Sequence, residues 1–220
     1  YYSRTVVSSV AGAGNYVQKV QHIEDVTKTA GEKVTLSFYA RADANKNIAV
    51  EFPQDFGTGG TPSATVTETG VTTFNLTASW QKFNVTVDMP SIAGKTIGTD
   101  SNSNTEVNFW FDAGSGFNSR TNSLGQQSGT FDIANVKLEL SDIATDFGPV
   151  DEAATRQRVL RYFERFSNTA SLYRVLTTGY MKTLTQAEGV LRFEEKRATP
   201  AISFSGATDF QVDNYPVAVP

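Results

Sequence analysis

The 220-residue sequence contains no cysteine, a single histidine and only two methionines. Without cysteine the chain has no disulfides, zinc–thiolate sites or thiol nucleophiles. One histidine excludes multi-histidine metal clusters and leaves His22 as the sole candidate base for a histidine-dependent triad. No run of about 18 apolar residues occurs, which argues against a membrane-spanning helix. With 19 basic and 23 acidic residues, the chain also lacks the basic excess that typifies nucleic-acid binders.

Uncharged polar residues are abundant instead. The chain has 27 Thr, 18 Ser and 13 Asn, which together make 58 of the 220 positions. Charged residues amount to 19%, below the roughly 25% of average domains. Threonine favours half-buried strands, whereas Ser, Asn and Gly favour turns. The composition therefore predicts an all-β fold.

The hydrophobic pattern of the first two thirds supports that prediction. Residues 33–42 alternate strictly between apolar and polar, which is the pattern of a strand with one face in a core. A polar turn then leads into a second strand, and we expect these two to form a hairpin. At Ala134-Asn135 the apolar residues change from odd-numbered to even-numbered positions, as a β-bulge would require. Strands are expected near residues 5–10, 16–23, 33–42, 48–52, 71–77, 80–89, 107–111 and 129–140. A β-sandwich or jelly roll is the architecture expected for such a set of strands.

The character of the sequence changes after Gly148-Pro149. A segment without glycine or proline follows, with acids at its start and arginines towards its end, as the helix dipole favours. This predicts a connecting helix over residues 149–167 whose apolar stripe forms a subunit or domain interface. The stripe residues are Val159, Leu160, Phe163 and Phe166. Strands are expected again at Ser171–Thr177, Val190–Glu194 and Ala201–Phe204, too few for a closed core. The domains expected are thus a sandwich at 1–148, the helix, and a truncated second β domain at 168–220.

Several motifs resemble one family. Residues 79–99 (SWQKFNVTVDMPSIAGKTIGT) and 108–140 (NFWFDAGSGFNSRTNSLGQQSGTFDIANVKLEL) are similar to the carbohydrate-binding-module-like jelly roll of bacteriophage tail fibres, tailspikes and related virion proteins. Residues 21–43 resemble its early strands and residues 52–64 its glycine-rich loop. Residues 144–166 are similar to the connecting helix of those proteins. The resemblance covers roughly residues 20–166.

The resemblance implies a virion structural and adhesion protein, a fragment of a trimeric tail fibre or spike that contacts the host surface. The implied partners are two further copies of the chain, other virion tail proteins and a host cell-surface glycan, with no nucleic acid and no membrane insertion. Assembly would take place in the host cytoplasm and the mature location would be the virion. Two departures stand out. The helix has Val159 where the family usually has cysteine. The last strand has Ala134-Asn135 where secreted carbohydrate-binding jelly rolls carry two acids near a structural calcium, so neither metal nor cofactor is expected.

Sugar binding is the most specific chemistry that the residues support. Lectin-like sites combine an aromatic platform with carboxylates, amides or arginine for the hydroxyl groups. If the apolar residues of the strands face the core, several residues of this kind lie on outer faces. The candidates for carbohydrate binding are Tyr39, Arg41, Glu51, Trp110 and Asp112. Packing of Trp110 against a neighbouring subunit or the connecting helix is the competing interpretation. Trp80 is expected in the core or at its rim.

Catalysis is not expected, and no catalytic residue is assigned. The adjacent acids Glu24-Asp25 and Glu194-Glu195 would point to opposite faces of a strand, whereas a glycosidase needs two carboxylates flanking one bond. His22 falls in an expected strand and is interpreted as structural. Residues 56–60 (FGTGG) lack the Lys-Ser/Thr of a phosphate loop and are interpreted as a flexible surface loop. Two alternatives remain: a carbohydrate-binding module of a secreted polysaccharide-degrading enzyme, and a virion fibre segment without any ligand.

Overall fold

The computed structural model describes residues 1–149, 151–166, 179–183, 186–197 and 199–203. The chain divides into two units, Tyr1–Phe147 and Gly148–Pro220. Each unit is described by itself.

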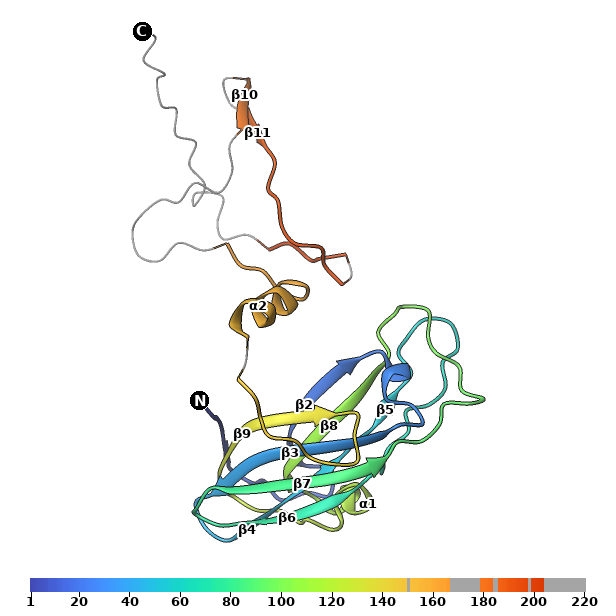
Figure 1. Cartoon of the computed structure of the whole chain (residues 1–220), viewed down its shortest axis with the longest axis vertical. Coiled ribbons are helices and arrows are strands. Elements are labelled where there is room, and N and C mark those ends of the chain that lie inside the picture. Colours follow the sequence, from blue (N-terminus) through green and yellow to red (C-terminus); the bar gives the residue numbers. More distant parts are fainter. Residues whose placement is uncertain (150, 167–178, 184–185, 198, 204–220) are drawn as a thin grey trace. The chain divides into compact units, whose positions relative to one another are not determined.

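The first unit is a sandwich of two antiparallel sheets (Figure 1). Sheet A has the strand order β1 (Ser3–Val7), β9 (Gly129–Glu139), β3 (Lys33–Ala42) and β7 (Gln81–Asp88). Sheet B has the order β2 (Tyr16–Glu24), β8 (Asn104–Ala113), β4 (Lys46–Glu51) and β6 (Thr72–Leu76), and β5 (Gln54–Asp55) pairs with β8. Apart from the neighbours β4, β5 and β6, consecutive strands alternate between the sheets. This winding is that of a jelly roll.

Alternate residues of both sheets meet in one apolar core. Phe38 of β3 lies at its centre, and its ring centroid is 5.2 Å from that of Phe74 and 5.1 Å from that of Phe109. The even-numbered residues of β3 face inward, as the alternation predicted. Burying each such side chain contributes about 1.5–3 kcal/mol. The core therefore holds the two sheets together and fixes which residues point outward.

The pairing of β3 differs from the expected hairpin. β3 pairs with β7 and β9 in sheet A, whereas β4 pairs with β6 and β8 in sheet B. The turn at residues 43–45 thus carries the chain from one sheet to the other. Alternation reports only that each strand has one buried face, and two strands facing each other across a core satisfy it as well as two neighbours. The hairpin prediction was wrong for that reason.

The β-bulge in β9 is confirmed. The register of β9 against β3 shifts between Tyr39, which lies opposite Ala134, and Ser37, which lies opposite Lys137. Asn135 sits in the bulge with φ of 51°, in the left-handed region where asparagine is tolerated better than most residues. The bulge moves the inward-facing positions from Ile133 to Val136 and Leu138, which explains the parity switch in the sequence.

Two long loops join at one end of the sandwich. The Gly98 amide donates to the Phe56 carbonyl at 2.8 Å, and the Asp100 amide donates to the Thr58 carbonyl at 3.1 Å. A Cβ on Gly98 would lie only 2.1 Å from the Thr58 carbonyl oxygen, so glycine is required for this approach. The glycine-rich segment is therefore tied to its neighbour by backbone hydrogen bonds. Short helices η1 (Val26–Lys28), η2 (Ser115–Phe117) and α1 (Asn118–Thr121) lie in other connections.

The second unit contains α2 (Glu152–Leu160) and a two-stranded sheet of β10 (Gly179–Thr183) and β11 (Gln186–Gly189). The Asp151 side chain caps α2 by accepting from two backbone amides. The helix ends at Leu160, earlier than expected, because the Tyr162 amide turns back onto the Val159 carbonyl in a tighter turn. The strand expected at Val190–Glu194 is irregular, as are residues 201–203, whereas Ser171–Thr177 and Phe204 lie outside the described residues.

Candidate functional site

The five residues predicted to bind sugar divide between the two sheets. Tyr39 and Arg41 lie on the outer face of sheet A, opposite the side that packs in the core. Glu51, Trp110 and Asp112 lie on the outer face of sheet B and are almost fully buried. The two groups therefore cannot contribute to one surface, since the whole sandwich separates them.

Trp110 has no exposed surface because the segment containing η2 and α1 covers it. Its indole nitrogen donates to Glu51 at 3.2 Å, and its ring centroid lies 5.3 Å from that of Phe117. Arg120, from α1, lies over the same ring at 5.0 Å and forms an ion pair with Glu51. The expectation of a sugar platform at Trp110 is thus corrected: the residue is fully buried by packing within its own unit.

The carboxylates of this second group are bonded to several of the loops that cover sheet B. Glu51 also accepts from the Glu68 amide at 3.2 Å. Asp112 accepts from the Ser9 hydroxyl at 2.9 Å and from the Gln127 amide. These bonds satisfy buried charges that would otherwise be costly. Both acids therefore serve the packing of the loops on sheet B and are not available to an external ligand.

The outer face of sheet A carries a different, exposed group, which we call the aromatic–arginine cluster: Tyr2, Arg4, Arg41, Trp80 and Asp132. Strand register brings it together. Asp132 of β9 lies opposite Arg4 of β1 on one side and opposite Arg41 of β3 on the other. Trp80 directly precedes β7 next to Arg41, because Ala40 pairs with Gln81. Four strands thus contribute to one row of side chains.

Aromatic rings and guanidinium groups alternate within the cluster. The Tyr2 and Trp80 ring centroids are 5.8 Å apart in an edge-to-face arrangement. The Arg41 guanidinium lies 5.0 Å from the Trp80 centroid and 5.9 Å from that of Tyr2, and Arg4 lies 5.4 Å from the Tyr2 centroid. Such cation–π contacts hold the side chains in place while leaving surface free. Tyr2 is 51% exposed and Trp80 is 37% exposed.

Asp132 is the buried anchor of the cluster. Its carboxylate accepts from Arg4 at 2.8 and 3.0 Å and from Arg41 at 3.0 Å. The hydrogen bond from Arg4, aided by that from Arg41, holds the pKa of Asp132 below its usual range despite burial. The same bond raises the pKa of Arg4. At neutral pH the trio therefore carries two positive charges and one negative charge.

Sequence reasoning identified Arg41 and Tyr39 on this face but missed Tyr2 and Trp80. Trp80 was expected in or beside the core, and it instead lies outside on sheet A. The alternation of β7 could have placed Trp80 correctly. Phe83 and Val85 pack against the core, so the odd-numbered residues face inward and the even-numbered Trp80 faces outward. Tyr2 could not have been placed, because its neighbours across the sheet depend on pairing with β9.

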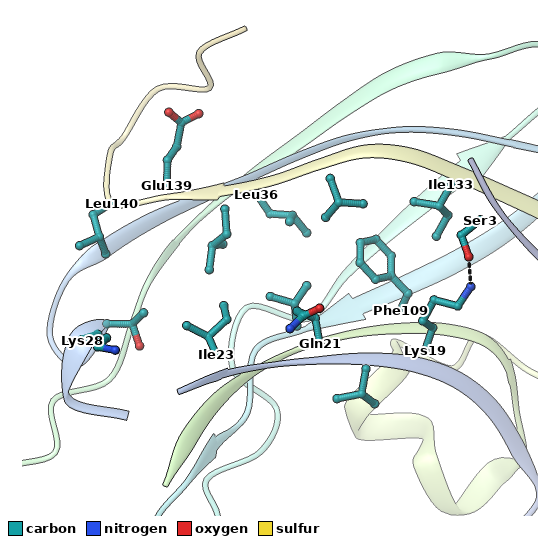
Figure 2. Close-up of a pocket in the computed structure, with 15 residues that line it drawn as sticks. Ser3, Lys19, Gln21, Ile23, Lys28, Leu36, Phe109, Ile133, Glu139 and Leu140 are labelled. Carbon is teal, nitrogen blue, oxygen red and sulfur yellow. Dashed lines mark hydrogen bonds between the residues drawn. The ribbon is translucent and has the colours of Figure 1, made fainter. Parts of the chain in front are cut away.

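A groove opens at the edge of the sandwich between β9 and β2 (Figure 2). Its volume is about 730 Å³. Aliphatic side chains of both sheets line it, among them Ile23, Leu36 and Leu138, and a Lys19–Ser3 hydrogen bond spans it near β1. Phe109 is the aromatic residue in this lining. Polar residues such as Lys19, Gln21 and Glu139 also line the groove, but Phe109 is almost fully buried. Because a sugar site needs an accessible aromatic face beside its polar groups, the groove suits a sugar less well than the aromatic–arginine cluster does.

Three further features considered in the sequence are His22, a metal site and a membrane-spanning helix. His22 lies on β2, with its Nδ1 3.0 Å from the Asn104 side-chain oxygen and 3.7 Å from Glu106. Among the described residues no group of three histidine or acidic side chains gathers as a metal site would require. Within the same residues, no helix has the length and apolar character needed to cross a membrane.

The apolar stripe of the connecting segment is exposed. Val159 is 52% exposed and Phe163 is 66% exposed, and Phe166 is also open to solvent. Leu160, the last helical residue, is half-buried. Because α2 ends there, Phe163 and Phe166 follow the helix and do not continue its face.

Comparison with known proteins gives only distant similarity. No model of a known family matches the chain, and no curated protein matches it in sequence. Among solved structures, a CBM4 structure is 22% identical, with 64% of this chain and 71% of that chain covered and a TM-score of 0.40. The tripod from the baseplate of bacteriophage Tuc2009 is 18% identical, with coverage of 67% and 49% and a TM-score of 0.37. A family 11 carbohydrate-binding module from Clostridium thermocellum, in complex with a mixed-linked tetrasaccharide, is 14% identical, with coverage of 63% and 82% and a TM-score of 0.35.

Proposed function

We propose that this chain is a glycan-binding adhesion segment of a bacteriophage tail fibre or spike, and that the aromatic–arginine cluster is its contact surface. The observation that carries the proposal is the exposed pair Tyr2 and Trp80 beside two arginines and a carboxylate. An indole or phenol ring offers an apolar face to the C–H side of a sugar ring, while guanidinium groups donate to hydroxyls. The proposed role is binding without catalysis.

The virion role and a homotrimeric state rest on the sequence resemblance and on the second unit. Val159 and Phe163 expose large apolar surfaces there, and an isolated two-stranded sheet such as β10–β11 is marginally stable in water. Both features favour burial against other copies of the chain. We propose that the other partners are virion tail proteins and a host surface glycan.

A glycan array probed with the 220-residue protein tests the adhesive role. Binding by the wild-type protein and its loss in Trp80→Ala would support the cluster as the contact surface. Tyr16→Ala is the matched control, since Tyr16 is comparably exposed, at 47%, on the other sheet. Thermal unfolding of each variant checks that it folds. A failure of the intact protein to bind any glycan would instead favour a fibre segment without ligand.

Mass measurement in solution separates the fibre from a module of a secreted polysaccharide-degrading enzyme. A trimer at micromolar concentration is expected for the fibre segment. A monomer at that concentration would favour the secreted module, which needs no apolar connecting stripe.

A further inference from the structure

The two guanidinium groups of the aromatic–arginine cluster use only some of their N–H donors within the cluster. An arginine side chain offers five N–H groups. Arg4 uses its Nε and Nη2 for Asp132, and Arg41 uses only its Nε. Among the described residues, neither Nη1 of Arg4 nor either terminal nitrogen of Arg41 donates to another group. The outer edges of both guanidiniums therefore remain available to a ligand.

The charge of the cluster is locally positive on a chain that is acidic as a whole. Two arginines against one aspartate leave an excess of one positive charge, whereas the chain has a formal net charge of −4. The neighbouring Lys82 does not add to it, because Asp146 binds it at 3.1 Å. The net charge of the chain disfavours a negatively charged glycan over long distances, whereas the local excess of positive charge at the cluster favours it.

The rings of Trp80 and Tyr2 fix the position of the positive charge on Arg41. The Arg41 guanidinium lies 5.0 Å from the Trp80 ring centroid and 5.9 Å from that of Tyr2, and its Nε donates to Asp132 at 3.0 Å. The terminal nitrogens are bonded to the same Cζ and therefore lie close to both rings of the proposed contact surface. A planar, fixed guanidinium edge matches the two oxygens of a carboxylate or phosphate, which it binds more strongly than a neutral hydroxyl.

We propose that the cluster selects acidic glycans, in which a carboxylate or phosphate substituent on the sugar is bound by the free guanidinium edges of Arg41 and Arg4. This inference rests on the proposed function, because it takes glycan stacking on Trp80 and Tyr2 as given. Carboxylate and phosphate substituents share one feature: each places an anionic group within one sugar unit of the ring that stacks.

The test compares matched acidic and neutral ligands by titration calorimetry with the full 220-residue protein. Tetragalacturonate is the carboxylate probe, its fully methyl-esterified form is the neutral probe, and mannose 6-phosphate is the phosphate probe. We expect at least one acidic probe to bind about tenfold more tightly than the neutral one, the size expected of a charge-assisted hydrogen bond. The preference should weaken between 50 and 500 mM salt, roughly the range over which exposed charges become screened.

Arg41→Gln is the diagnostic variant and Lys33→Gln is its control. Both remove one positive charge from β3, but Lys33 lies eight residues from Arg41, at the far end of the strand. Arg41→Gln should weaken binding of the acidic probe much more than binding of the neutral probe and so abolish the preference, whereas Lys33→Gln should retain it. The salt titration of the wild-type protein needs no variant and covers the case in which Arg41→Gln does not fold.

The outcomes distinguish the two proposals. Equal binding of acidic and neutral probes by the wild-type protein would overturn acidic selectivity and leave the adhesive role standing. A preference that survives both Arg41→Gln and Arg4→Gln would also overturn it. Absence of binding to these probes and to every glycan on the array would overturn the adhesive role, and the selectivity with it.

Discussion

Arg41 lies over the indole ring of Trp80, with its Cζ 5.0 Å from the ring centroid, although 39 residues separate the two in the chain. The contact exists because β3 and β7 are neighbours in sheet A, and it defines an exposed, ordered surface. On the opposite sheet Arg120 makes a chemically similar contact with Trp110, and there the tryptophan is fully buried. The same pair of residue types thus serves an open surface on one sheet and internal packing on the other.

Trp110→Ala is expected to destabilise the protein by about 3–5 kcal/mol, because it creates a cavity under α1 and removes a donor to buried Glu51. Chemical denaturation of the two proteins measures the change in the free energy of unfolding. Trp80→Ala serves as the comparison and should cost about 1 kcal/mol or less, since its side chain is partly exposed. Equal losses in the two variants would contradict the distinction between an internal and a surface tryptophan.

Asp132 should make stability depend on acid pH. Its pKa is lowered in the folded protein, mainly by Arg4, so its stabilising contribution is present above the usual aspartate pKa of about 3.9. That contribution is lost as the pH falls through the lower pKa of the folded state. Melting temperatures from pH 7 to pH 2 for the wild type and Asp132→Asn measure it. We expect the wild type to be more stable at pH 7 and the gap to close in acid; a constant gap would contradict the assignment.

Asn135→Val should destabilise the protein by about 1–2 kcal/mol, because a β-branched residue is strained at a φ of 51°. Asn135→Gly should be nearly neutral at the same position. The urea midpoint is a sufficient measurement. Asn84→Val, an exposed substitution in the regular strand β7, is the control and should leave the midpoint almost unchanged. If Asn135→Val were equally harmless, the bulge would not be a fixed feature of β9.

The proposed trimer should dissociate to monomer in the double variant Val159→Ser, Phe163→Ser, because the variant removes exposed apolar surface from the connecting segment. Light scattering at several protein concentrations measures the mass. Arg158→Ser, which changes an exposed polar residue of α2, is the control and should leave the mass unchanged. A trimer that persists in the double variant would place the subunit contacts elsewhere in the chain.

The local features of the fold were accessible from the sequence. Strict alternation located β3 to the residue, and the parity switch located the bulge at Asn135. Both are local consequences of the period of a strand, so no neighbour is needed to infer them. The end of α2 was less accessible: the apolar spacing continued to Phe166, but the chain leaves the helix at Leu160.

The candidate site was predicted only in part, since strand pairing decides it. Arg41 was identified from its outward position on β3, but its contacts with Trp80, Tyr2 and Asp132 come from three other strands or their flanks. The same alternation assigned Trp110 to an outer face correctly and gave no indication that α1 would cover it. A two-residue period fixes the side of a sheet on which a residue lies, whereas exposure depends on what else packs there.

The sequence by itself determined an all-β first unit, its strand positions and the inward or outward direction of most strand residues, because these follow from local periodicity. The tertiary structure decided which sheet each strand joined, which tryptophan was buried and which was exposed, and that three strands place two arginines around Asp132. These outcomes depend on contacts between residues far apart in the chain, such as Arg4 and Asp132, which no local pattern encodes.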